Sequence, residues 1–366
     1  MPKPNRVTKL AVCLAFVATA IVALPMPVDA ARAQAKQSKP AAKAPSTKAT
    51  TPKAAPARST PKKKAYSATT AKARRQQLAK ARAAAAAREL RELQTPRFRV
   101  DEFGREVPDV RAEAAIIYNP TTGEVLWEDH AQDQRSIASI TKVMTALVFL
   151  ESGAPLNQPE TVVRTDVTRA STTYLRSGFK LTAEDLLNLL LVGSDNAAAR
   201  ALARISPYGA QGFIAKMNEK ALELGLVSTR YADPSGLLAD NVSSAYDQAR
   251  LIAHASADER VGGIMRKQTY STKSGKQAIT ARSTNHIVRS GDIDVVGGKT
   301  GFINRSGYCL ATLLRLPSTG EQVAVVVLGA KSNASRFWET RHLFNWMTAR
   351  TKTVADGEAQ QQQQQH

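Results

Sequence analysis

The chain has 366 residues, a length that fits one large domain or two small ones, and its formal net charge is +20. Residues 1–94 hold 20 Lys and Arg residues and only three acids, so the remaining 31 basic and 28 acidic side chains leave residues 95–366 close to neutral. The high isoelectric point therefore belongs to an N-terminal arm, and a protein that binds nucleic acid over its whole surface is excluded.

The first 30 residues are typical of a secretory signal peptide. Lys3, Arg6 and Lys9 precede the apolar run 10–24, and the small residues of Val28-Asp-Ala30 fit a cleavage site. An apolar run of this length is shorter than the roughly 20 residues that a membrane-spanning helix needs. An uncleaved anchor is the alternative, and we expect export to the periplasm or the cell envelope.

Residues 31–94 form a basic arm. Its first part, 31–77, contains Ala, Lys, Pro, Thr and Ser with almost no large apolar side chain, so we expect a disordered tether. Residues 78–94 are rich in Ala, Leu, Arg and Glu, which favour a solvated helix. The arm is either a soluble spacer or an electrostatic attachment to an anionic surface of the envelope.

A globular domain is predicted for residues 97–350, followed by a disordered Gln-rich tail at 351–366. Strand patterns lie at both ends of this domain and helix patterns lie between them, which predicts an α+β domain with an antiparallel sheet built from its two ends. Thr182, with Asp185 three residues later, is a good N-cap, and Gly193 ends the same helix. The expected elements are a hairpin at 114–119 and 124–128, helices at 139–152, 181–192, 196–205, 209–224, 244–257 and 334–348, and extended segments at 161–164, 268–273, 278–283, 294–299, 307–316 and 322–330.

The sequence gives no pattern for a metal or a cofactor. Its five histidines lack the spacing of metal ligands, so we predict no metal site and no cofactor. Two cysteines are present, Cys13 in the leader and Cys309 in a strand-like run. Cys309 is best interpreted as a small buried apolar residue.

A serine and a lysine lie three residues apart in Ser139-Ile-Thr-Lys142, so on a helix they share one face. The same spacing occurs at Ser59-Thr-Pro-Lys62 and Ser177-Gly-Phe-Lys180, but only Ser139 begins an apolar helix. Backbone N–H groups at a helix N-terminus stabilise negative charge. Taken alone, Ser139 is better explained as a helix cap or a small core residue than as a nucleophile.

Two further triplets complete a pattern. Ser194-Asp-Asn196 follows directly after a helix, and Lys299-Thr-Gly301 ends an apolar strand that contains Gly297 and Gly298. Each has an ordinary explanation, a helix cap for the first and a turn between strands for the second. Ser-x-x-Lys, Ser-Asp-Asn and Lys-Thr-Gly in this order are the signature of class A β-lactamases and penicillin-binding proteins.

Over about residues 110–350 the sequence resembles the low-molecular-mass penicillin-binding proteins, which are serine-type D-alanyl-D-alanine carboxypeptidases and small DD-endopeptidases. The resemblance extends to more specific blocks: Asp233-Pro-Ser-Gly-Leu237 with Asn241, Ser243-Ser-Ala-Tyr-Asp247, Thr284-Asn-His286, Gly298-Lys-Thr-Gly-Phe302 and Ser306-Gly-Tyr308. It implies the β-lactamase/DD-peptidase-like fold, an antiparallel sheet with helices on both faces and a helical subdomain. The C-terminal β-domain and amphipathic anchor of the larger carboxypeptidases are not seen, and the sequence looks closer to the endopeptidases.

The resemblance also implies a role for each residue. Ser139 would be the acylated nucleophile, Lys142 its base and Ser194 a proton relay; Asn196 would bind a substrate amide, and Lys299 and Thr300 would bind the terminal carboxylate beside Gly301 and Phe302. The N–H groups of Ser139 and Phe302 would form the oxyanion hole. Because a free lysine has a pKa near 10.4, Lys142 must be buried, and we expect Lys299 to be a second cation that lowers its pKa. The implied partners are peptidoglycan stem peptides and, as acylating inhibitors, β-lactams such as penicillin.

Two other functions compete with this interpretation. A class A β-lactamase needs a catalytic glutamate between the second and third triplets, but this interval holds the Asp233–Leu237 block and no Glu-x-x-Leu-Asn. A non-catalytic cell-wall-binding protein would not need all three triplets intact. The sequence leaves open whether the enzyme is a carboxypeptidase or an endopeptidase.

Overall fold

The computed structural model describes residues 68–364 and the side chains of 72–88 and 90–352. The predicted signal peptide and the part of the tether up to residue 67 lie outside these residues. The first helix, α1 (Ala68–Gln94), begins earlier than the predicted 78–94, and its described side chains are almost all exposed. Within residues 68–364, no helix combines the length and the apolar character needed to cross a bilayer. The domain limits that we infer from sequence stay a prediction.

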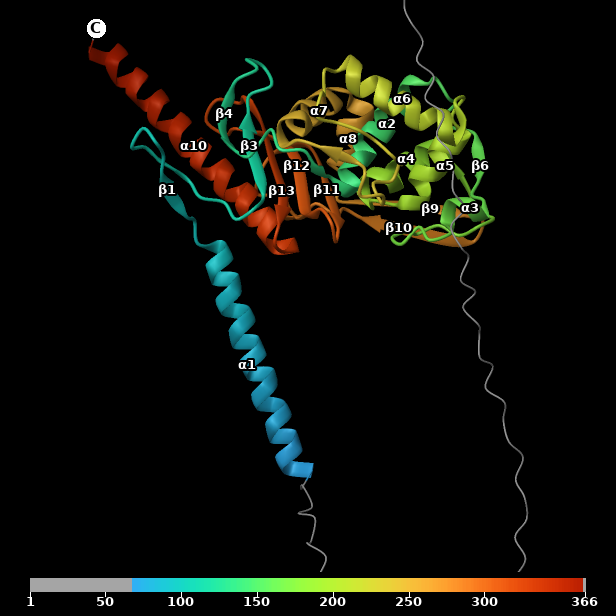
Figure 1. The fold of residues 1–366 in the computed structure, drawn as a ribbon, viewed down its shortest axis with the longest axis horizontal. Helices are drawn as coiled ribbons and strands as arrows, with labels where there is room; N and C mark the ends of the chain where they lie inside the picture. The colour runs from blue at the N-terminus through green and yellow to red at the C-terminus, as the bar shows by residue number, and fades with distance from the viewer. Residues whose placement is uncertain (1–67, 365–366) are drawn as a thin grey trace, which may run out of the picture. The chain divides into compact units, whose positions relative to one another are not determined.

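A five-stranded antiparallel sheet joins the two ends of the globular part, in the order β11-β12-β13-β3-β4 (Figure 1). The first hairpin, β3 (Ala114–Tyr118) and β4 (Val125–Asp129), matches the prediction. The other strands come from the last third of the chain, β11 (Val295–Ile303), β12 (Gly307–Arg315) and β13 (Gln322–Ala330). Pairing of β13 with β3 joins the two ends of the globular part in one sheet, and the predicted fold class is confirmed.

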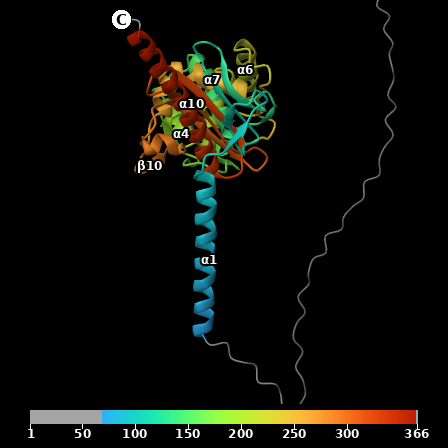
Figure 2. The same ribbon diagram turned by 90° about the vertical axis from the view of Figure 1, so that its left-hand side faces the viewer.

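Both faces of the sheet are buried, so every residue of β3 is buried. Successive side chains of a strand point to opposite faces; Ile116 packs into the helical core, while Ile117 packs with Phe337 and Leu343 of α10. Helix α10 (Asn333–Gln364) therefore covers one face, and it lies in front of the sheet in Figure 2. It exceeds the predicted 334–348 and continues through the Gln-rich segment for which we expect disorder. Cys309 is buried in β12 and is a free thiol.

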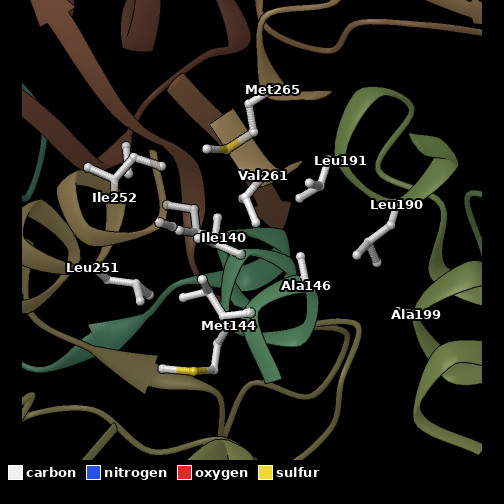
Figure 3. Close-up of a cluster of buried hydrophobic side chains, with 14 of the residues drawn as sticks. Ile140, Met144, Ala146, Leu190, Leu191, Ala199, Leu251, Ile252, Val261 and Met265 are labelled. Carbon is white, nitrogen blue, oxygen red and sulfur yellow. The ribbon is translucent and has the colours of Figure 1, made fainter. Parts of the chain in front are cut away.

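The other face carries the helical subdomain, whose centre is α2 (Lys142–Glu151). Nine of the ten residues of α2 are buried because other helices surround it. Figure 3 shows Met144 and Ala146 of this helix pointing into the core. An apolar helix placed there fixes the position of any side chain on its first turn. The surrounding helices are α4 (Ala183–Val192), α5 (Asn196–Ile205), α6 (Gly209–Glu223), α7 (Ala245–Ala257) and α8 (Glu259–Met265).

The predicted cap of α4 is present in both directions. Thr182 Oγ1 accepts from the Asp185 N–H at 3.0 Å, and Asp185 Oδ2 accepts from the Thr182 N–H at 3.0 Å. Elsewhere the local prediction is wrong: the expected strand at 161–164 is β6 (Pro159–Thr161), followed after two residues by the short helix α3 (Arg164–Val167). Two short helices, α8 and α9 (His286–Ser290), were not predicted because their caps, Asp258 and Asn285, precede too few apolar residues to show a helical period. The remaining strands are β1 (Phe98–Val100), β2 (Glu106–Pro108), β5 (Arg135–Ser136), β7 (Lys180–Thr182), β8 (Val242–Ser243), β9 (Thr269–Ser274) and β10 (Gln277–Arg282).

Candidate active site

Ser139 lies one turn before α2, on the 3-10 helix η1 (Ala138–Thr141), rather than on the first turn of α2 itself. Ala138 has a left-handed backbone with φ +49°, which sets the short helix apart from the strand before it. A 3-10 helix has three residues per turn, so residues i and i+3 eclipse. Ser139 Oγ consequently accepts a hydrogen bond from Lys142 Nζ at 2.9 Å.

The amine of Lys142 is fully buried and makes three contacts. Besides Ser139, it donates to Asn196 Oδ1 at 2.6 Å and to the carbonyl of Ser235. Burial is the main cause that lowers the pKa of Lys142 to about 7, against the opposing charges of Asp233 and Asp195. A substantial fraction of this amine is therefore neutral near pH 7.

Ser194 contacts Lys299 of the third triplet, Lys299-Thr-Gly301. It follows the end of α4 with a left-handed φ of +58°, a strained conformation for a serine. Lys299 Nζ donates to Ser194 Oγ at 2.8 Å and to the Thr300 carbonyl at 3.0 Å. Lys299 is also buried, and burial lowers its pKa well below the usual value, with further lowering by the charges of Lys142 and Arg336. The sequence predicts that Lys299 is the cation that lowers the pKa of Lys142. The structure assigns this effect to Arg200 instead.

Asn196 begins α5, and the oxygen and the nitrogen of its side-chain amide each make one hydrogen bond. Its Oδ1 accepts from Lys142, and its Nδ2 donates to the Ala170 carbonyl at 2.6 Å. A carboxamide has two donor hydrogens and two acceptor lone pairs, so one position at each end is still free for a substrate amide. Its neighbour Asp195 caps α5 and accepts from the Tyr174 N–H at 2.6 Å, which fixes the loop that faces the site.

Strand β11 packs directly against η1, with no room for a side chain at Gly301. A Cβ placed on Gly301 would lie 2.5 Å from the Ile137 carbonyl oxygen and 3.2 Å from the Ser139 nitrogen, so only glycine fits here. Phe302 follows at the rim; its ring is stacked on Tyr308 at a centroid distance of 4.2 Å. The backbone around Gly301 and Phe302 is therefore held next to the N–H of Ser139.

A cavity of about 430 Å³ opens between these elements. Six of the eight predicted site residues line it, while Lys142 and Lys299 lie behind Ser139 and Ser194 as hydrogen-bond partners. The structure thus brings all eight together. The six that line the cavity are Ser139, Ser194, Asn196, Thr300, Gly301 and Phe302. Among the described residues, no group of three or more His, Cys, Asp or Glu side chains is placed to hold a metal ion.

Sequence reasoning did not assign a role to three further residues at the site. Thr284 Oγ1 lies 2.6 Å from Thr300 Oγ1, and the Ser235 carbonyl accepts from Lys142; both residues lie in blocks that carry the family resemblance. Arg336 of α10 donates to the Gly301 carbonyl at 2.9 Å. No local pattern points to Arg336, because α10 reaches the site only by packing on β12 and β13.

Comparison with known proteins agrees with this geometry. Residues 101–332 match the model of the S11 peptidase family, described as D-alanyl-D-alanine carboxypeptidase. The chain belongs to this family. It is 35% identical over 257 residues to a D-alanyl-D-alanine endopeptidase of Haemophilus influenzae, and this similarity covers 68% of the chain and 88% of the relative.

Solved structures of this group have the same fold. The crystal structure of the Streptomyces K15 DD-transpeptidase aligns with a TM-score of 0.62 at 28% identity, over 66% of this chain and 98% of that one. Penicillin-binding protein D2 of Listeria monocytogenes, in its cefotaxime-bound form, aligns with a TM-score of 0.58 at 30% identity, over 65% and 97% of the two chains. The S11 peptidase described here is thus a serine-type DD-peptidase with a penicillin-binding fold.

Proposed function

We propose that this DD-peptidase cleaves the D-alanyl bonds that cross-link peptidoglycan stem peptides, through an acyl-enzyme on Ser139. The observation that carries the proposal is the buried amine of Lys142, which has a pKa of about 7 and lies 2.9 Å from the Ser139 hydroxyl. The similarity to an endopeptidase along most of that relative's length favours cross-linked peptides over free D-alanyl-D-alanine ends.

In the first step the neutral amine of Lys142 takes the proton of Ser139 as Oγ bonds to the carbonyl carbon of D-alanine. The carbonyl oxygen becomes negative, and the N–H groups of Ser139 and Phe302 stabilise it. The closeness of Gly301 to the Ser139 nitrogen supports this pairing. Asn196, which binds the Lys142 amine, keeps that amine directed at Ser139.

The amine that leaves needs a proton, and we assign its delivery to Ser194, which lines the cavity and is hydrogen-bonded to Lys299. The proton that Lys142 took from Ser139 then replaces the one that Ser194 donates. The carboxylate beside the leaving amine binds Thr300, while Lys299 holds Ser194 in position through its hydrogen bond. Water then attacks the acyl carbon and gives a proton to the Lys142 amine. Lys142 passes this proton to Ser139 Oγ as the acyl bond breaks and the shortened stem peptide leaves.

Digestion of purified sacculi tests this function. We expect the wild-type enzyme to convert cross-linked dimers to monomers, as seen by mass of the fragments, and Ser139→Ala to leave them intact. Shortening of pentapeptides with unchanged dimers would instead show a carboxypeptidase. Activity retained in Ser139→Ala, or labelled penicillin attached to a peptide without Ser139, would contradict the mechanism. Turnover of benzylpenicillin within seconds would indicate a β-lactamase.

We further propose that the protein is exported and that its arm contacts anionic components of the cell envelope. The signal-like residues 1–30 support export, and the 17 basic residues among residues 31–94 support the contact. Membrane, lipopolysaccharide and wall polymers share the required negative charge.

A further inference from the structure

A second cavity, of about 800 Å³, adjoins the active-site cavity. Thr284 and Arg336 line both cavities, so the two adjoin at these side chains. The rest of its wall comes from α9, from the first turns of α10 and from the end of α1, which contributes Leu90 and Gln94. We call this cavity the arginine groove, after Arg289, Arg336 and Arg341 in its wall.

The arginine groove lies where the leaving group must pass, given the proposed function. Thr300, assigned to the carboxylate beside the leaving amine, is hydrogen-bonded to Thr284 at 2.6 Å. Arg336 holds the neighbouring Gly301 carbonyl. A leaving group larger than one amino acid therefore extends past Thr284 and Arg336 into the groove, while a single D-alanine ends before it.

The groove is positively charged. Its wall contains three arginines and one acid, Asp292, which is paired with Arg341. Arg289 donates to the Ser283 carbonyl and Arg336 to those of Gly301 and Cys309, and carbonyls do not neutralise a cation. Among the described residues, neither arginine has a carboxylate within ion-pair distance. The groove thus suits a ligand that carries several negative charges.

We infer that the arginine groove binds the second stem peptide of a cross-linked pair, the acidic peptide that departs with the amine, and so favours cross-linked over monomeric substrates. The free carboxylates of this peptide meet Arg289 and Arg336. Trp338 and Leu90 supply apolar surface for its side chains. The helical end of the basic arm becomes part of the substrate site.

Ala334 lines the groove on the first turn of α10, so a positive or a negative side chain placed there should have opposite effects on binding of an acidic peptide. We expect Ala334→Lys to raise the ratio of kcat/KM for a cross-linked dimer to that for a monomeric pentapeptide by about threefold, and Ala334→Glu to lower it by about threefold, as one partly exposed charge pair would. Ala210 is the matched control, an exposed alanine on the first turn of α6 outside both cavities. Its Lys and Glu variants should leave the ratio unchanged.

Binding to full-length Ser139→Ala separates this inference from the proposed function. The dimer should bind more tightly than the monomer, and adding Ala334→Glu should reduce this preference by about threefold. A dimer that is cleaved by the wild type while both Ala334 variants change the ratio in the same direction, or not at all, overturns the groove alone. A dimer that the wild type never cleaves overturns the proposed function, and equal binding of dimer and monomer to Ser139→Ala then overturns the groove as well.

Discussion

Lys142 Nζ lies 2.9 Å from Ser139 Oγ although the two residues belong to different helices, a 3-10 turn and the α-helix that follows it. The 3-10 turn places the serine directly over the lysine, and the α-helix buries the lysine in the core. Burial lowers the pKa of Lys142 to about 7. Nucleophile and base are therefore positioned and tuned by the same short segment.

Acylation by a labelled penicillin should depend on pH through Lys142. The neutral amine is the base, and its fraction rises as pH increases through about 7, so the acylation rate should fall roughly tenfold per pH unit below that value. Lys142→Arg keeps a charged side chain at every pH and should lower the rate on the order of 10²–10⁴-fold. A rate independent of pH between about 5.5 and 8.5, with the protein folded by circular dichroism, would show that another group is the base.

Position 236 requires a glycine because its backbone lies against the backbone of Ala138 and Ser139. It has a φ of +79°, and a Cβ there would lie 2.0 Å from the Ala138 carbonyl oxygen. Gly236→Ala should lower the free energy of unfolding by about 2–5 kcal/mol through backbone strain and overpacking, and should also reduce penicillin labelling because Ala138 precedes Ser139. Urea unfolding and labelling measure the two effects.

Gly275 is the control for this substitution. It also has a positive φ, +57°, but a Cβ on it would meet nothing within 4 Å. Gly275→Ala should therefore cost only the strain of the left-handed backbone, about 1–2 kcal/mol, with labelling unchanged. Equal effects of the two substitutions would contradict the steric argument.

Glu339 of α10 should make stability depend on pH. Burial raises the pKa of Glu339 to about 7, and only one of its oxygens has a partner, the Ala112 N–H at 3.0 Å. Because the folded state binds this proton more tightly than the unfolded state, the free energy of unfolding should fall as pH rises from about 4 to about 7 and then level off. Its contribution is on the order of 3 kcal/mol.

Glu339→Gln removes the titrating group, so its unfolding midpoint in urea should change less between about pH 5 and 8 than that of the wild type. Glu128→Gln, on an exposed residue of β4, is the control and should keep the wild-type slope. A Glu339→Gln variant with an unchanged slope would show that the carboxyl titrates at its ordinary pKa.

Sequence patterns predict what is local in this molecule. The cap of α4 at Thr182 and the hairpin of β3 and β4 depend on neighbouring residues, and the structure has both. The three triplets could be identified because their residue types and order are visible in the sequence. Which of their side chains face the cavity depends on the packing of β11 against η1. The role of Arg336 and the arginine groove were not predictable, because Arg336 reaches the site only when α10 packs on the sheet, and the groove forms only where α10 contacts α1.

The contributions of charge and length in the basic arm can be tested separately. Residues 36–66 contain nine Lys and Arg residues and no acid. Replacing all nine by Gln keeps the length and removes nine of the 17 positive charges of residues 31–94, whereas replacing the eight lysines by Arg keeps both length and charge. If the arm is an electrostatic attachment, the Gln variant should be washed from isolated envelopes at low salt, while the wild type and the Arg variant should elute only as salt screens their charge. Quantitative immunoblots of the washes measure this, and identical elution of all three proteins would leave the arm as a spacer.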